Sequence, residues 1–194
     1  NINKKINNTK KVLFIGDSFT FGDAVNDDQT FPSFYENLIN DNVLNGGVGS
    51  YGIDQMFIRA LDIINNHSIS ELYFCLIPDD ILRCEADVRH RLRKPYFIIN
   101  DDRLKLIPID VIKLDDIIAF KHTLFHKTFG YSFFINSFMR KFFTDYWFNA
   151  MPITYRSIHK NGEEVSTYLL NSLFNICKER NINFYLIPLG HGFY

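Results

Sequence analysis

The segment KVLFIGDSFTFG, residues 11–22, is the most informative part of this chain and directs attention to the side chain of Ser18. It opens with a short apolar run that is typical of a buried strand, and the small residues Gly16-Asp17-Ser18 then predict a sharp turn. In an open α/β sheet, ligands bind at the carboxyl ends of the strands. Ser18 therefore has two interpretations. It caps the helix that follows, as serine commonly does, or it presents its hydroxyl group to a substrate.

The rest of the chain repeats this alternation of strand and helix. Apolar runs predict strands over residues 12–15, 43–44, 72–77 and 183–187. Apolar residues at helical spacing predict helices over residues 31–39, 53–64 and 163–180. The alternation predicts a parallel sheet with helices on both faces, and right-handed crossovers bring the loops after the strands to a common edge. Ser18, a glycine-rich loop that starts at Asn45 and Pro78-Asp79-Asp80 are expected to meet there.

One segment, about residues 96–160, departs from the alternation and is interpreted as an insertion. It opens with YFIINDDRLKLIP, which predicts a hairpin that turns at Asp101-Asp102. The helical stretch that follows is rich in aromatic residues, and such density indicates core packing, with a lid or a partner surface as the alternative. Residues 1–10, rich in Asn and Lys, are expected to be a flexible lead-in to a single domain over residues 11–194.

Composition argues against several classes of function. The 21 basic residues against 22 acidic ones leave a formal net charge of −1, which offers no electrostatic basis for nucleic-acid binding. No apolar run approaches the ~20 residues of a membrane helix. The three cysteines match neither a disulfide framework nor a zinc motif, and no metal or other cofactor is expected. No signal peptide is visible, and the chain begins with Asn1, so the compartment is left open, as is the oligomeric state.

One local cluster of basic residues stands out against this balanced background. It consists of Arg83, Arg89, Arg91, Arg93 and Lys94. We interpret it as a solvated helix face, with contact to an anionic substrate as the alternative.

The second loop, NGGVGSYGIDQ over residues 45–55, contains glycines that permit close backbone approach. By itself it indicates no more than a glycine turn before a helix. Together with GDSFTFG, however, it resembles the SGNH (GDSL-type) hydrolase family, over most of residues 11–95 and over residues 163–188. The resemblance implies a flavodoxin-like three-layer α/β/α fold. It also implies that Ser18 is the nucleophile and that the N–H groups of Ser18 and Gly47 form the oxyanion hole.

The family implies a serine esterase or acylhydrolase that works through an acyl-enzyme. Its substrate would be an O-acyl ester, chiefly an O-acetyl ester, of a carbohydrate, a lipid or a small molecule. A histidine would take the proton of Ser18, and the oxyanion hole would stabilise the charge that develops on the carbonyl oxygen; Asp17 is expected to hold the loop. The alternatives are an O-acyltransferase and a catalytically degenerate SGNH-like domain that binds an acylated glycan or a protein partner.

The third block of the family normally offers an asparagine amide to the oxyanion, but Asp79 stands at that position. An ionised carboxylate accepts hydrogen bonds and donates none. At ~4 Å from an oxyanion it costs roughly 4 kcal/mol at an effective dielectric constant near 20. The hypothesis is that Asp79 impairs catalysis, so that Asp79→Asn raises esterase activity.

The last block of the family, Asp-x-x-His, does not follow Pro188. The literal match Asp87-Val88-Arg89-His90 is expected to lie on a helix that leads away from Ser18, and we interpret it as a coincidence. His191 follows the last strand but has no acidic partner nearby in sequence. We therefore expect the C-terminal part of the domain, with the catalytic histidine, to lie beyond Tyr194.

Overall fold

The computed structural model describes residues 11–89, 92–100, 103–109, 131–143 and 155–190. Contacts divide the chain into two compact units. The first unit comprises Asn1–Glu85, Tyr96–Ile107 and His159–Tyr194, and the second comprises Ala86–Pro95 and Pro108–Ile158. All three predicted site residues, Ser18, Gly47 and Asp79, belong to the first unit.

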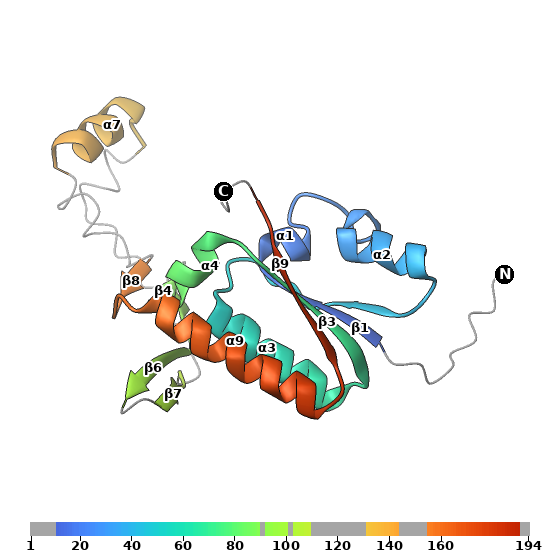
Figure 1. Ribbon diagram of the computed structural model, residues 1–194. Coiled ribbons are helices and arrows are strands. Elements are labelled where there is room, and N and C mark those ends of the chain that lie inside the picture. The colour runs from blue at the N-terminus through green and yellow to red at the C-terminus, as the bar shows by residue number, and fades with distance from the viewer. Residues whose placement is uncertain (1–10, 90–91, 101–102, 110–130, 144–154, 191–194) are drawn as a thin grey trace. The chain divides into compact units, whose positions relative to one another are not determined.

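The first unit is built on a four-stranded parallel sheet in the order β2-β1-β3-β9 (Figure 1). The strands are β1 (Lys11–Ile15), β2 (Val43–Asn45), β3 (Ile69–Leu76) and β9 (Asn183–Pro188). The four predicted strands are therefore confirmed. Because the chain passes from β1 to β2 on one side and then returns to place β3 on the other, the order reverses between β1 and β3. In open α/β sheets, ligands bind outside the carboxyl ends of the strands at such a point.

Helices cover both faces of this sheet and confirm the three-layer α/β/α architecture. The helical elements are α1 (Ser18–Phe21), η1 (Asp27–Gln29), α2 (Phe31–Ile39), α3 (Ile53–Asn66), α4 (Pro78–Arg83) and α9 (Gly162–Glu179). Side chains alternate across a strand, so Leu13 and Ile15 of β1 enter the core shared with α3 and α9. Val12 and Phe14 point the other way and pack with Tyr35 of α2.

The predicted hairpin is also present in the first unit. Strands β6 (Tyr96–Asn100) and β7 (Arg103–Ile107) pair antiparallel, with Tyr96 opposite Ile107 and Asn100 opposite Arg103. Phe97 is buried and packs edge-on against Phe57 of α3, with ring centroids 5.8 Å apart. The predicted turn residues 101–102 lie outside the described residues.

The second unit contains a three-stranded antiparallel sheet and one described helix. Its strands are β4 (Ala86–Arg89), β5 (Leu92–Arg93) and β8 (Tyr155–Ser157), in the order β5-β4-β8, and the helix is α7 (Phe133–Phe142). The prediction that Asp87 to Arg89 belong to a helix is wrong, because these residues pair as a strand with β5 and β8. His90 lies outside the described residues.

The aromatic residues of α7 do not form a core. Phe133 is 87% exposed and Phe134 is 77% exposed, and Tyr131, Phe138, Phe142 and Phe143 are also exposed. For these residues the prediction of core packing is wrong, because their side chains are exposed. The remaining aromatic residues of residues 120–148 lie outside the described part of the chain.

The basic cluster is not a solvated helix face. Arg83 ends α4 and is buried, and Lys94 is buried as well. Arg89 and Arg93 lie on paired strands, β4 and β5. Residues distributed over a helix and two strands cannot form one helix face, so this prediction is wrong. Within the described ranges, no helix is long and apolar enough to cross a membrane.

Candidate active site

Ser18 is the first residue of α1 and follows β1 closely, at the carboxyl end of that strand (Figure 1). The residue that caps α1 is Asp17, whose Oδ1 accepts a hydrogen bond from Phe19 N at 3.0 Å. The interpretation of Ser18 as the helix cap is therefore wrong. Its side chain is half-buried, and among the described residues its hydroxyl group makes no hydrogen bond.

The serine loop (residues 16–22) needs glycine at its first position. A Cβ added at Gly16 would collide with the Thr20 hydroxyl and lie 2.9 Å from Cys75 O. Gly22 ends α1 with φ of 89°, in the left-handed region that glycine adopts without strain. The two glycines thus stand on either side of the four-residue helix α1. Gly16 allows close packing before the helix, and Gly22 allows the backbone to end it.

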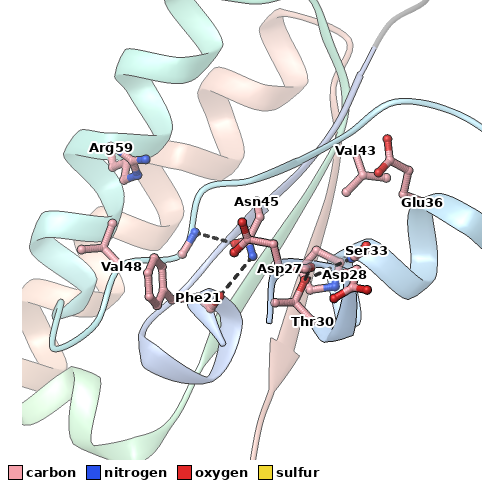
Figure 2. A pocket seen from close by; sticks show the side chains of 12 residues that line it. Phe21, Asp27, Asp28, Thr30, Ser33, Glu36, Val43, Asn45, Val48 and Arg59 are labelled. Atoms are coloured by element: carbon pink, nitrogen blue, oxygen red, sulfur yellow. Dashed lines mark hydrogen bonds between the residues drawn. The ribbon is translucent and has the colours of Figure 1, made fainter. Parts of the chain in front are cut away.

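Asn45 joins the serine loop to the glycine loop (residues 45–52). Its Oδ1 accepts a hydrogen bond from Gly47 N at 3.0 Å (Figure 2). Its Nδ2 donates to Thr20 O at 2.9 Å. The last carbonyl groups of a helix have no partner within the helix, and Asn45 supplies one to the end of α1. We call this set of contacts the Asn45 bridge.

Gly47 packs directly against the backbone of α1. A Cβ at this position would collide with Phe21 N and lie 2.7 Å from Thr20 C, so only glycine permits this approach. The N–H group of Gly47, which the family resemblance assigns to the oxyanion hole, donates to Asn45 Oδ1 in this structure. Its role as an oxyanion donor remains a prediction, and it requires that the substrate oxygen share or replace the Asn45 contact.

The aspartate loop (residues 77–83) follows β3 and contains two neighbouring carboxylates with different surroundings. Asp80 is fully buried, and its Oδ2 accepts a hydrogen bond from Ile77 N at 2.9 Å. The side chain of Asp79 is 67% exposed, and its Oδ2 lies 3.7 Å from Arg83 Nη2. The residue at the family's asparagine position is therefore a solvent-exposed carboxylate beside an arginine.

Arg83 connects this loop to the other two. Its Nη1 lies 2.6 Å from Asp80 Oδ1 and 3.2 Å from Asp17 Oδ2, and it donates to Tyr51 O at 3.1 Å. We call Asp17, Asp80, Arg83 and the Tyr51 carbonyl the Arg83 cluster. Its three charged side chains are all buried. Asp17 thus holds its loop, as expected, and does so both as a helix cap and through an ion pair.

Burial raises the pKa of Asp80 to about 7, from an ordinary value of 3.8. The nearby negative charges of Asp17 and Asp79 act in the same direction. The Ile77 N–H and the Arg83 guanidinium oppose the shift, but desolvation of the carboxylate is the larger effect. The carboxyl group of Asp80 therefore titrates near neutral pH.

A cavity of about 570 Å³ lies beside Gly47, along the outer edge of β2 (Figure 2). Its lining residues are Phe21, Asp27, Asp28, Thr30, Pro32, Ser33, Glu36, Val43, Asn45, Gly47, Val48 and Arg59. Asn45 and Gly47 belong also to the Asn45 bridge, whereas Ser18 does not line this cavity. Arg59 Nε donates to Gly46 O at 2.8 Å and so ties the glycine loop to α3.

Gly47 packs against the end of α1, the helix that Ser18 begins, and Arg83 links Asp79 to the serine loop. No described histidine hydrogen-bonds to Ser18. His67 is exposed at the end of α3. His122, His126 and the weak candidate His191 lie outside the described residues. The residues described here also contain no cluster of His, Cys, Asp or Glu that could hold a metal ion.

Comparison with solved structures finds chains of the family that the motifs resemble. The chain is similar to the SGNH-hydrolase family esterase AlinE4, with 20% identity and a TM-score of 0.35 over 39% of this chain and 43% of AlinE4. It therefore spans less than half the length of that esterase. It is also similar to a G-D-S-L family protein from Desulfitobacterium hafniense DCB-2, with 16% identity and a TM-score of 0.36 over 92% of this chain and 77% of the other.

A further similar structure is a member of the lipolytic protein G-D-S-L family from Veillonella parvula DSM 2008, with 13% identity and a TM-score of 0.32. It covers 91% of this chain and 76% of that protein. At such TM-scores the similarities assign no role to any residue. No protein-family model matches the chain, and no curated protein matches it.

Proposed function

We propose that this chain is a serine esterase of SGNH type, with Ser18 as its nucleophile. The main observation behind the proposal is that Asp17, and not Ser18, caps α1. The Ser18 hydroxyl group follows the carboxyl end of β1 and makes no hydrogen bond among the described residues. The location after β1 is the point where the strand order reverses, which is where α/β sheets bind ligands.

The proposed reaction proceeds through an acyl-enzyme. Ser18 Oγ forms a bond to the ester carbonyl carbon while a base takes its proton, and the carbonyl oxygen becomes an oxyanion. Collapse of this intermediate breaks the bond to the alcohol oxygen, which receives the proton from the base. Water then adds to the acyl carbonyl carbon while the base takes a proton from it, and the bond to Ser18 Oγ breaks. Ser18 Oγ recovers the proton from the base, and the carboxylic acid leaves. The base is not assigned among the described residues.

The oxyanion would be stabilised by backbone N–H groups of Ser18 and Gly47. One such donor is worth ~10²–10³ in rate in other hydrolases. The Asn45 bridge holds the Gly47 N–H within 3.0 Å of a neutral amide oxygen, so the substrate oxygen would compete with this contact. Asp79 cannot donate a hydrogen bond while it is ionised, and its replacement by asparagine would supply the third donor.

The proposed substrate is an O-acyl ester, and specifically an O-acetyl ester, of a carbohydrate, a lipid or a small molecule. Transfer of the acyl group to another hydroxyl group in place of water would make the same site an O-acyltransferase. The second candidate function is a catalytically degenerate SGNH-like domain that binds an acylated glycan or a protein partner. Two observations favour it: the exposed carboxylate of Asp79 and the Gly47 N–H that is already engaged.

Labelling with a fluorophosphonate probe, followed by intact-mass spectrometry and peptide mapping, tests the proposal. A hydrolase with an activated serine takes up one probe molecule, and the adduct maps to Ser18. Ser18→Ala abolishes labelling, whereas the control Ser70→Ala leaves it unchanged, because Ser70 lies on β3 and its hydroxyl group contacts only Lys11 O, at 3.4 Å. Asp79→Asn raises the labelling rate if the carboxylate opposes the oxyanion.

A folded full-length protein that takes up no probe, in the wild type and in Asp79→Asn alike, contradicts the esterase proposal. The degenerate binding domain is then the better reading. An adduct at another serine, with Ser18→Ala still labelled, contradicts the assignment of Ser18 itself.

A further inference from the structure

Arg83 lies where the three loops at the carboxyl edge of the sheet meet. Its Nη1 atom reaches Asp17 in the serine loop at 3.2 Å and the Tyr51 carbonyl in the glycine loop at 3.1 Å. The same atom reaches Asp80 in the aspartate loop at 2.6 Å. These partners come from three separate segments of the chain, and Arg83 contacts each of them directly.

Arginine is suited to this position because its guanidinium group is planar, always charged and rich in donors. A lysine ammonium in the same place is a compact point charge, without the second arm that Arg83 extends toward Asp79 at 3.7 Å. Arg83 is 7% exposed and Asp17 and Asp80 are fully buried, so the contacts are shielded from water and from salt. Shielded pairs of this kind hold their geometry better than exposed ones.

Arg83 contacts Asp17, which directly precedes the proposed nucleophile Ser18 in the chain. Asp17 uses Oδ1 to cap α1 at Phe19 N and Oδ2 to pair with Arg83. Ser18 lies between Asp17 and Phe19 in the chain, so the orientation of its backbone depends on that cap. The contact with Tyr51 O places the end of the glycine loop relative to the same carboxylate.

We propose that Arg83 is a positioning residue, which holds the loops that carry Ser18, Gly47 and Asp79 at a fixed separation. The inference rests on the proposed function for its catalytic consequence. Arg83 itself acts through Asp17, Tyr51 and Asp80 and is not expected to touch the substrate. Neither of the two motif blocks of the family resemblance contains it.

The test compares Arg83→Lys and Arg83→Met with the wild-type chain by two measurements. Hydrogen exchange reports on the backbone of residues 16–22, 46–52 and 77–83, and fluorophosphonate labelling reports the maximum rate and the probe affinity separately. Arg83→Met is expected to raise exchange at least tenfold in the serine and glycine loops together. It is also expected to lower the maximum labelling rate at least tenfold at nearly unchanged affinity. Arg83→Lys is expected to recover part of both losses, because it keeps the charge.

Arg180→Met is the matched control. Arg180 is exposed and makes one side-chain hydrogen bond, to Asn65 Oδ1 at 2.8 Å, so neither measurement should change. Because Arg83→Met leaves Asp17 and Asp80 buried without a cation, Arg83→Lys is the deciding variant if the methionine variant does not fold.

Two results distinguish the positioning role from the proposed function. Exchange that rises only in residues 77–83, with labelling intact, overturns the positioning role. A full-length wild-type protein that takes up no probe overturns the proposed function, and the exchange of the serine and glycine loops then decides by itself whether Arg83 holds them. Coupled loosening of both loops supports that role, and its absence overturns it.

Discussion

The serine loop is held at two places by contacts of opposite character. The Asn45 bridge is neutral, and it lies at an exposed residue that hydrogen-bonds to Thr20 O and Gly47 N. The Arg83 cluster is charged and buried, and it joins Asp17 to Asp80 through one guanidinium group. Both connect the serine loop to a loop from a neighbouring strand, so the chain uses two different interactions for the same purpose.

The difference lies in how each attachment responds to change. A neutral hydrogen bond at the surface contributes about 0.5–1.5 kcal/mol to stability, because water replaces it when it breaks. A buried ion pair contributes little relative to an apolar replacement, but removal of one partner costs about 3–5 kcal/mol, since a charge remains in a dry site. Stability is therefore expected to depend strongly on mutation and pH at the Arg83 cluster and only weakly at the Asn45 bridge.

The largest expected effect concerns pH and the Arg83 cluster. Because the pKa of Asp80 is about 7 in the folded chain and near 3.8 in the unfolded chain, the folded state binds this proton more tightly. The unfolding free energy therefore falls as pH rises from about 4 to about 7, by roughly 4 kcal/mol from this group. Asp80→Asn should remove this component, as urea denaturation at a series of pH values would show.

Asp79→Asn is the control for the pH prediction, because Asp79 is exposed and lies on the same short helix. It keeps Asp80, so its stability should still fall as pH rises, but the loss of the nearby negative charge should move this fall to slightly lower pH. Parallel stability curves for Asp80→Asn and the wild type would show that the carboxyl group of Asp80 does not titrate in this interval.

The next effect concerns the contact between the glycine loop and α1. Gly47→Ala should lower the free energy of unfolding by about 1–3 kcal/mol, because the added Cβ meets the backbone of Thr20 and Phe21, which cannot move without displacing α1. Gly49→Ala is the matched variant, since its Cβ meets only the Asp23 carboxylate, at 3.4 Å, and should change stability by less than about 0.5 kcal/mol. Equal losses in the two variants would contradict the close approach of Gly47 to α1.

The smallest effect tests the Asn45 bridge itself. Asn45→Ala removes the acceptor of Gly47 N and the donor to Thr20 O, and it should cost about 1 kcal/mol in urea denaturation, independent of pH. Asn65→Ala, which removes an exposed hydrogen bond to Arg180, serves as the comparison. A loss as large as that of Arg83→Met would mean that the two attachments do not differ as their burial and charge indicate.

Much of the fold could be predicted from local patterns. The strands, the main helices and the hairpin follow from apolar periodicity and from turn residues, because both act over a few neighbouring positions. Predictions failed where burial depends on distant partners. Arg83 was placed on a solvated face, and the aromatic residues of α7 were placed in a core, because sequence spacing does not show which face of an element another element covers.

In the candidate site, too, some residues could be predicted from the sequence and others could not. Ser18 and Gly47 were identifiable from two short motifs that resemble the SGNH family. The Arg83 cluster and the Asn45 bridge were not, although Asp80 and Arg83 stand three residues apart on α4. That spacing is common to many surface pairs, and only the position of Asp17 makes it a buried cluster.

The alternation of strand and helix and the position of Ser18 at the end of an apolar strand follow from residues that are near one another in the chain. The need for glycine at Gly16 and Gly47 comes from distant residues, because Gly16 lies close to Cys75 O and Gly47 lies close to the backbone of Thr20 and Phe21. Tertiary contacts also pair Asp17 with an arginine 66 residues away and bring Asn45 to a carbonyl group 25 residues before it. Partners so far apart meet only after the parallel sheet has brought the ends of β1, β2 and β3 to one edge.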